Sequence, residues 1–157
     1  MTHQIQSQFK QAMRRLAANV SLISCKVNGE WAGIAATAVC SLSMDPPSLV
    51  ACVNRQASIH PGLSVGDHYC INLLKEGQED VSNAFGKVIK CDDKFAFGNW
   101  VQNRDGTPCL SDAHVNIFCA VQKIIDYGSH SIVVGNVTRI QMNEIGAPLV
   151  YFDGGYL

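Results

Sequence analysis

The sequence has little charge, no excess of either sign and no long apolar run. Only 16% of its 157 residues are charged, and twelve lysines and arginines against thirteen acids give a net charge of −1. This balance argues against nucleic acid or an anionic membrane as the main partner. No run approaches the roughly 18 apolar residues that a membrane-spanning helix needs. Few charges are available to cover the surface of a small domain, so we expect part of it to be buried in a homodimer.

The common nucleotide-binding and metal-binding motifs are also missing. The chain has no Gly-rich phosphate motif of the Rossmann or P-loop type and no HExxH. Its five histidines are scattered and pair with no acid at ligand spacing, so we expect no metal site. The chemistry therefore does not depend on any of these familiar side-chain arrangements.

Cysteine is abundant but unpatterned. There are seven, an odd number, and no C-x-x-C that would indicate a zinc ribbon or a thioredoxin-type site. Five lie in apolar, strand-like runs, and we interpret them as reduced thiols of a cytoplasmic protein; they are Cys25, Cys40, Cys52, Cys70 and Cys119. The opening residues 1–4 show neither the basic segment nor the apolar run of a signal peptide.

The hydrophobic pattern predicts a single, mainly β domain over residues 1–157. Apolar residues at three-to-four spacing indicate a helix over 4–18 that docks by its apolar face and leaves a basic face in solvent. Period-two alternation and the turn signals Asn28-Gly29 and Gly128-Ser129 then indicate about seven strands. These cover residues 20–27, 31–39, 48–53, 68–74, 113–127, 130–142 and 148–152.

Three further segments complete the expected architecture. Residues 61–65 suggest a helical turn and 76–85 an internal helix, whereas 86–109 have no clear period and read as a long loop. Helices do not regularly separate the strands, which disfavours a parallel sheet. We therefore expect a small antiparallel barrel with an N-terminal and an internal helix, because closure removes open strand edges.

Three segments are candidates for a binding site. In residues 33–43 nearly every side chain is small, so a flat ring such as a flavin could lie against the backbone; the alternative is a tightly packed barrel strand. In residues 54–60, Arg55 and Ser58 could hold a phosphate, or Arg55 could simply pair with an acid. His130 on its turn and Tyr156 in a Gly-rich tail could line a cleft, or be an exposed turn and a frayed terminus.

The order of these segments resembles the short-chain flavin reductases, the flavin-reductase-like split-barrel family. Members supply reduced flavin to two-component monooxygenases such as hydroxyphenylacetate hydroxylase. No single segment is specific to this family. The same segments in the same order over nearly the whole chain are specific to it. The matching pieces are residues 9–18, 36–47, 52–55 with Ser58 and His60, 71–74, 93–95, Trp100, Gly128-x-His130 and 148–156.

The resemblance implies a homodimeric split barrel of Greek-key type that binds FMN or FAD and takes hydride from NADH or NADPH. His130 and Tyr156 match positions that face the nicotinamide, and His130 is the catalytic candidate. The resemblance also implies a set of cofactor-binding residues: Gly33, Ala35, Ala36, Thr37, Ala38, Val39, Cys40, Ser41, Asn54, Arg55, Ser58, Ile59, His60, Phe85, Gly86 and Lys87.

Two positions depart from the family pattern. Relatives often have Ser where Ala38 stands, and many have Asp where Ser129 precedes the turn histidine. Neither change removes a group that the chemistry requires, because the flavin itself accepts the hydride at N5. The expected function is an NAD(P)H:flavin oxidoreductase that serves a flavin-dependent monooxygenase. The alternatives are an oxidase of the pyridoxamine-phosphate type with tightly held FMN, and a non-catalytic flavin-binding module.

Overall fold

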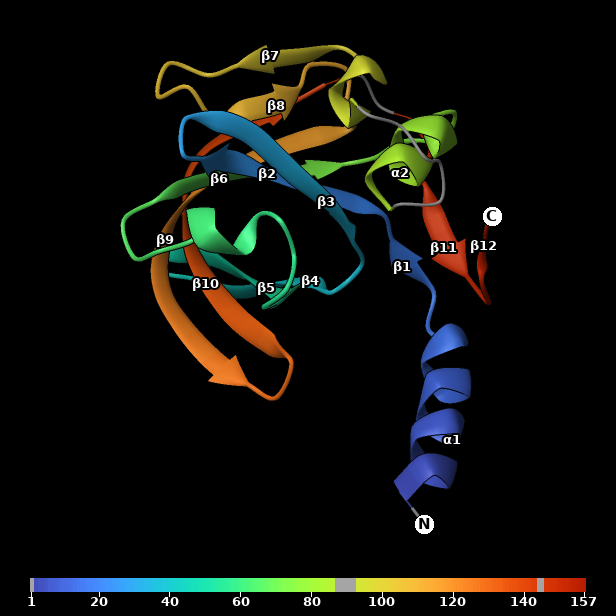
Figure 1. The fold of residues 1–157 in the computed structure, drawn as a ribbon. Coiled ribbons are helices and arrows are strands. Elements are labelled where there is room, and N and C mark those ends of the chain that lie inside the picture. Colours follow the sequence, from blue (N-terminus) through green and yellow to red (C-terminus); the bar gives the residue numbers. More distant parts are fainter. Residues whose placement is uncertain (1, 87–92, 144–145) are drawn as a thin grey trace.

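A curled antiparallel sheet of seven strands forms the centre of the protein (Figure 1). The computed structural model describes residues 2–86, 93–143 and 146–157. Every neighbouring pair of strands in this sheet is antiparallel. In spatial order the strands are β3 (Glu30–Ala36), β2 (Ser21–Val27), β6 (His68–Leu73), β9 (Val115–Tyr127), β10 (His130–Met142), β5 (Pro47–Asn54) and β4 (Val39–Met44).

The barrel is split between two strands that follow each other in the chain. β3 and β4 are the edge strands of the sheet, although only Thr37 and Ala38 separate them. The Ala38 carbonyl accepts a hydrogen bond from the Cys52 amide at 3.0 Å, which ties this corner to β5. The sequence predicted one strand over 31–39 and missed β4, because a run of small residues does not reveal where the backbone bends.

Tight turns account for the two hairpins that the sequence predicted. Asn28 and Gly29 have φ values of 51° and 84°, the left-handed conformation of a two-residue hairpin turn. Gly128 has a φ of 56° between β9 and β10. The register places His130 opposite Tyr127 across this second turn.

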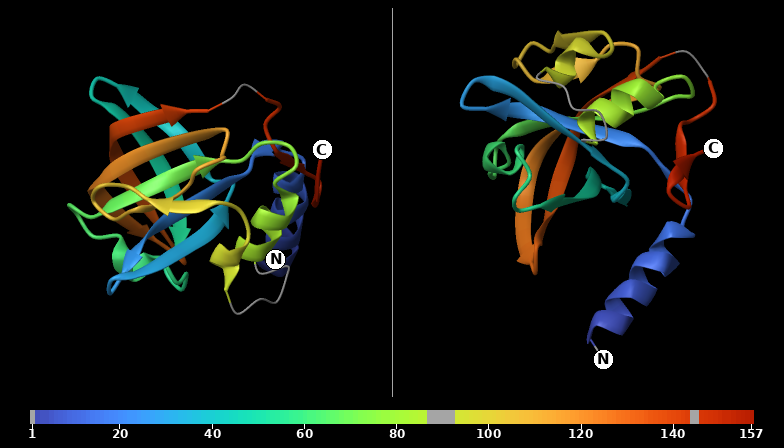
Figure 2. Two further views of the ribbon diagram at one scale, coloured as in Figure 1. Left: turned by 90° about the horizontal axis from the view of Figure 1, so that it is seen from above. Right: turned by 45° about the vertical axis from the view of Figure 1, so that its right-hand side comes forward.

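Two hydrophobic cores lie on the two faces of β2. Consecutive side chains of a strand point to opposite faces, so Ile23 packs inside the barrel and Leu22 packs outside it. The outer core lies under α2 (Glu79–Phe85), the internal helix that the sequence predicted. Viewed from above, this helix covers one side of the sheet (Figure 2).

An aromatic cluster extends the outer core into the segment predicted as a long loop. Phe85 stacks on Trp100 with ring centroids 5.0 Å apart, and Phe95 meets both rings edge-on. The prediction of a structureless 86–109 is wrong for residues 93–109, which form η2 (Lys94–Ala96), β7 (Trp100–Gln102) and β8 (Pro108–Leu110). Elements of three residues are too short to show a period.

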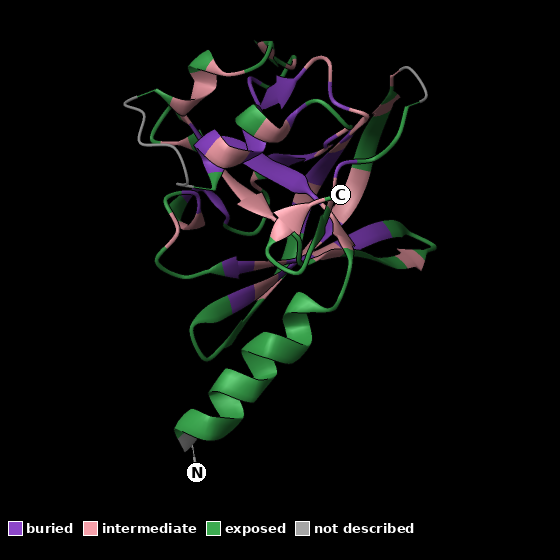
Figure 3. Cartoon of the chain, turned by 90° about the vertical axis from the view of Figure 1, so that its right-hand side faces the viewer, coloured by how far each residue is buried: buried purple, intermediate pink, exposed green. Residues whose placement is uncertain are grey.

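The N-terminal helix projects from the domain (Figure 3). α1 (Thr2–Arg14) ends four residues before the predicted boundary, and its apolar stripe is exposed, with Phe9 at 66%. The apolar face of this helix therefore does not dock on its own domain. Beyond it, β1 (Ala18–Asn19) pairs with β11 (Val150–Phe152), which pairs with β12 (Gly155–Tyr156). Within the described residues, no helix has the length and apolarity that crossing a membrane requires.

Candidate functional site

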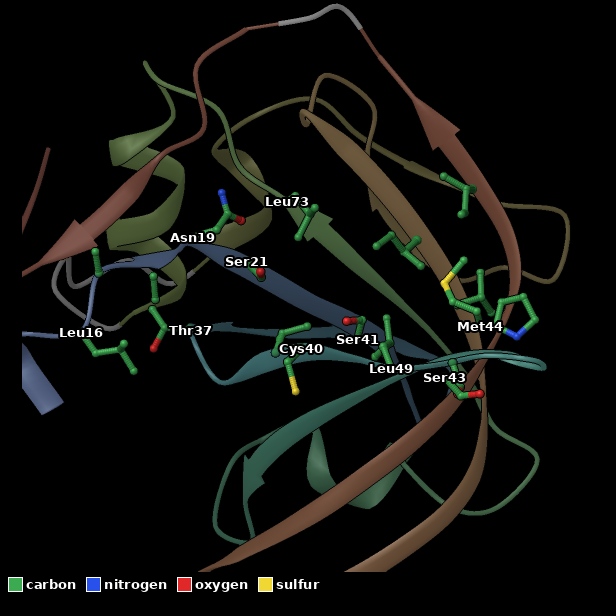
Figure 4. A pocket seen from close by; sticks show the side chains of 18 residues that line it. Leu16, Asn19, Ser21, Thr37, Cys40, Ser41, Ser43, Met44, Leu49 and Leu73 are labelled. Carbon is green, nitrogen blue, oxygen red and sulfur yellow. The ribbon is translucent and has the colours of Figure 1, made fainter.

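The corner between β3 and β4 separates two cavities, and Thr37 lines both. The larger has a volume of about 620 Å³ and is bounded by β4, the start of β5, β10 and the residues after α1 (Figure 4). Its walls are mostly apolar, with Cys40 and Ser41 among the exceptions. The smaller, of about 220 Å³, lies between β3, α2 and the C-terminal strands.

Most residues of the predicted ring-binding segment lie at these cavities. Val39, Cys40 and Ser41 line the larger one. Ala35 and Ala36 line the smaller one together with Gly86 and Tyr156. Thr37 and Ala38 are exposed, so residues 35–41 form an accessible edge and are not the tightly packed strand of the alternative reading.

This edge fits a flat, partly polar ring. Its side chains are small, which lets a planar ligand approach the backbone, and the edge strands β3 and β4 have main-chain groups facing away from the sheet. An isoalloxazine has ring faces that need apolar contact and an edge of nitrogens and carbonyl oxygens that needs hydrogen bonds. The residues present therefore suit a flavin.

Three predicted cofactor residues belong to the cores instead. Ile59 is fully buried inside the barrel, and Phe85 is buried in the aromatic cluster. Gly33 is covered by Phe85, since a Cβ at Gly33 would lie 2.7 Å from the Phe85 ring, and its carbonyl accepts a hydrogen bond from Lys94. Other parts of the protein therefore cover the side chains of Ile59 and Phe85 and the Cα of Gly33, and the role of these three residues in cofactor binding stays a prediction. Lys87 lies outside the described residues.

The predicted phosphate loop lies at the same end of the sheet as the corner. The bonded Cys52 amide precedes Asn54 by two residues, a distance of about 7 Å along a strand. The Arg55 amide donates to the Ser129 carbonyl at 3.0 Å, so the loop also touches the turn that carries His130. Arg55 and Ser58 are both exposed.

The Arg55 guanidinium has no acidic partner among the described residues. Across residues 2–86, 93–143 and 146–157, the ion pairs are Arg14 with Asp153 and His68 with Asp105. The alternative of an arginine held by an acid therefore finds no support in this part of the chain. The exposed guanidinium remains available for an anionic ligand.

The turn histidine has a hydrogen-bond partner despite the departure from the family pattern. His130 is exposed, and its Nδ1 lies 2.8 Å from the Ser129 hydroxyl. A hydroxyl can orient an imidazole as a carboxylate does, although it brings no charge. Ser129 thus supplies the orienting contact that the missing Asp had put in doubt.

The C-terminal tyrosine is anchored and not frayed. The Tyr156 hydroxyl donates to Asn83 Oδ1 at 2.7 Å and lies 2.9 Å from Ser82 Oγ, both on α2. His130 lies at the tip of the β9–β10 hairpin, whereas β12 lies beside α2 on the other side of the corner (Figures 1 and 2). One chain therefore does not bring the two predicted nicotinamide residues together.

The cysteines separate into core thiols and one cavity residue. Burial raises the pKa of the Cys25 and Cys119 thiols to about 12, so both stay protonated at neutral pH. Cys70 and Cys109 are also buried, and Cys52 is half-buried. Cys40 is exposed and lines the larger cavity, which is compatible with the implied contact between this residue and the cofactor. Cys91 lies outside the described residues.

Two other kinds of catalytic site find no support. Residues 62–66 match the G-x-S-x-G pattern of serine hydrolases, but Ser64 lies on the loop after η1 (His60–Gly62) and not on a strand-to-helix turn. Within the three described ranges, no group of three His, Cys, Asp or Glu side chains is placed to hold a metal ion.

Comparison with known proteins places the chain among flavin reductases. Residues 13–157 match the family model described as "Flavin reductase like domain". The protein named FMN reductase (NADH) RutF 2 from Rhizobium rhizogenes is 38% identical over 149 residues, which are 95% of this chain and 86% of that protein.

Solved structures agree with the fold. Flavin reductase PheA2 superposes with a TM-score of 0.86 at 28% identity, covering 96% of this chain and 95% of that one. A homologue of nitrilotriacetate monooxygenase component B from Mycobacterium thermoresistibile gives 0.91 at 26%, covering 100% and 88%. With its split barrel, its accessible corner and this agreement over nearly its full length, the chain belongs to the flavin reductase-like domain family.

Proposed function

We propose that the protein is an NADH-dependent flavin reductase whose flavin is FMN. The observation that carries this is the placement of the small-residue corner and the Arg55 loop at one end of the sheet, so that a single ligand could meet both. The named activity of the RutF 2 relative, an FMN reductase that uses NADH, supports the same choice of flavin and donor.

Each part of the site has a separate role. Residues 37–41 would contact the ring, and Asn54, Arg55 and Ser58 the phosphate end. When bound, the flavin supplies the redox chemistry, because its N5 accepts a hydride from the nicotinamide. The side chains of the site bind and orient the flavin and the nicotinamide.

The function is tested by comparing electron donors and flavins. The protein should oxidise NADH when FMN is the electron acceptor. FAD and riboflavin are tested as alternative acceptors under the same conditions. An oxidase of the pyridoxamine-phosphate type would purify yellow and reduce its flavin with an amine instead, and a binding module would bind FMN without oxidising NADH. Either result would overturn the proposal.

We further propose that the protein acts as a homodimer. Four apolar side chains of α1 and its extension are exposed on one stripe, and apolar residues at the ends of β4 and β10 are exposed as well. The α1 stripe consists of Ile5, Phe9, Met13 and Leu16, and the strand residues are Leu42, Met44, Ile140 and Met142. A second copy would cover such surfaces, and it could bring the Tyr156 of one chain near the His130 of the other.

The dimer should be sensitive to a charge on the α1 stripe. We expect Phe9→Asp to weaken dimerisation at least about tenfold, because an unpaired carboxylate would be buried in the interface. Gln11→Asp adds the same charge away from the stripe and should leave the dimer intact. Sedimentation over a range of concentrations measures both. A wild-type monomer, or equal effects of the two variants, contradicts the assignment.

His130 should contribute to nicotinamide binding more than to flavin binding. We expect His130→Ala to raise the KM for NADH about 2- to 12-fold, the range for one net hydrogen bond. The KM for FMN should change little. Ser129→Ala should produce a smaller change in the same direction, because it removes only the group that orients the imidazole. Unchanged turnover and NADH KM in His130→Ala would refute this role.

The product is proposed to serve a flavin-dependent monooxygenase in the cytoplasm. One structural relative is itself named as a component of a monooxygenase, which supports this kind of partner. The six described cysteines are all free, as expected in a reducing compartment. The partner could receive the flavin by contact or by diffusion, and a coupled hydroxylation assay through a dialysis membrane separates the two routes.

A further inference from the structure

A chain of three polar side chains lies behind the proposed phosphate loop. His60 Nε2 lies 2.8 Å from Ser131 Oγ, and the Ser131 hydroxyl donates to Asp126 Oδ1 at 2.6 Å. His60 ends the loop, whereas Ser131 and Asp126 face each other on β10 and β9. The contact therefore joins two segments that lie 71 residues apart in the sequence.

The chemistry of the three groups sets the direction of the hydrogen bonds. A carboxylate only accepts, so the Ser131 hydroxyl gives its hydrogen to Asp126. Its lone pairs then face His60, whose Nε2 must carry a hydrogen and donate. Ser131 is fully buried, so losing either partner would leave a buried hydroxyl with an unmet hydrogen bond.

The loop between these contacts is held by hydrogen bonds along its length. The Gln56 amide donates to Asn54 Oδ1 at 2.9 Å, and the Ala57 amide donates to the Asn54 carbonyl at 2.9 Å. At the other end, the His60 amide donates to the Ala57 carbonyl, and Ile59 is inserted into the barrel core. A restraint on His60 is thus transmitted along a short, hydrogen-bonded path to Arg55.

The same hairpin also carries His130. Asn54 lies opposite His130 in the β5–β10 register, and the Arg55 amide donates to the Ser129 carbonyl. Together with the His60 contact, these interactions attach the loop to the hairpin at its start and at its end. The Arg55 loop and the turn that carries His130 are therefore fixed relative to each other.

We propose that His60, with Ser131 and Asp126, is a positioning residue that holds the Arg55 loop against the β9–β10 hairpin for binding the flavin phosphate. This revises the implied direct contact of His60 with the cofactor, and it rests on the proposed function. His60 acts through Arg55. Its removal should therefore weaken ligands that carry the phosphate and spare ligands that lack it.

The test compares the dissociation constants of FMN and riboflavin, measured by quenching of flavin fluorescence. His60→Ala should weaken FMN about three- to tenfold, in the range of one net hydrogen bond, and leave riboflavin within about twofold. Ser131→Ala should do the same. His60→Gln, whose amide can still donate to Ser131, should recover part of the loss. His68→Ala removes an exposed histidine from another part of the sheet and is the matched control.

A double-mutant cycle with Arg55 completes the test. If His60 acts only by placing Arg55, adding His60→Ala to Arg55→Ala should cause no further loss of FMN affinity. Additive losses, or equal weakening of FMN and riboflavin by His60→Ala, would overturn the positioning role. If Arg55→Ala itself fails to discriminate FMN from riboflavin, the phosphate assignment falls and this proposal with it. A selective Arg55→Ala beside an unselective His60→Ala refutes the positioning role alone.

Discussion

Replacing Arg55 by alanine should weaken FMN binding about 10- to 140-fold, the range for a charge-assisted hydrogen bond, and change riboflavin binding little. Arg55 is exposed at the end of the sheet that carries the Thr37–Ala38 corner. No acid among the described residues pairs with it, so its guanidinium is free to meet a phosphate. Riboflavin has the same ring without the phosphate, and it isolates this one interaction.

Two controls sharpen this prediction. Arg55→Lys keeps the charge but loses the planar fork, so an intermediate loss is expected. Arg104→Ala removes an exposed arginine from the turn between β7 and β8 and should leave both flavins unaffected. If Arg55→Ala weakened FMN and riboflavin equally, the residue would support the fold of the site and would not bind the phosphate.

The second large effect is expected for stability, at the fully buried Asn72. Its amide nitrogen donates to the Leu22 carbonyl and to Ser24 Oγ, both at 3.0 Å. Its oxygen accepts from the Leu110 amide at 2.9 Å and from Asn116 at 2.8 Å. This one side chain joins β2 to β8 and β9. The network fixes the end of β8 against the barrel.

Asn72→Ala should lower the free energy of unfolding by about 3–4 kcal/mol, because it leaves several buried polar groups without a partner. For a chain of this size that corresponds to a fall in Tm of about 6–16 °C. Asn136→Ala is the control, since its amide makes one exposed contact with Gln122. Calorimetry that finds the two variants equally stable would show that the Asn72 network is dispensable.

The sequence was most informative where side chains alternate over many residues. The strands that become β9 and β10 run for 13 residues each, and the sequence predicted both together with the turn between them. Asn28-Gly29 likewise identified the first hairpin, because few other dipeptides adopt positive φ at two successive positions. Alternation over many residues and special turn residues are local properties of the chain, so the sequence alone reveals them.

The features that the sequence did not predict depend on contacts between residues that are distant in the chain. β4 follows β3 after two residues, and whether a run of small residues continues straight or bends depends on the β5 amide that meets Ala38. The exposure of the α1 stripe depends on what packs against it, and the spacing of apolar residues does not indicate this. Short elements such as β7 gain their strand form from the Phe85 and Trp100 cluster, whose members are distant in sequence.

The candidate site was predicted in part for the same reasons. Residue types indicated a ring surface around Thr37 and a phosphate group at Arg55. The resemblance also implied Gly33, Ile59 and Phe85, and no sequence pattern indicated that the two cores cover these positions. The His60 contact with Ser131 was not foreseen, because it depends on a register between β5, β9 and β10 that brings distant residues together.

The most direct test of the central claim is the anaerobic loss of the visible absorbance of oxidised FMN when NADH is added to catalytic amounts of the protein. The wild type should bleach many equivalents of FMN. Ala38→Trp, which fills the corner, should bleach FMN far more slowly, while Val65→Trp on the loop before β6 should match the wild type. Absence of NADH-dependent bleaching by the wild type, or full activity of Ala38→Trp, would contradict a flavin reductase with its ring at the split of the barrel.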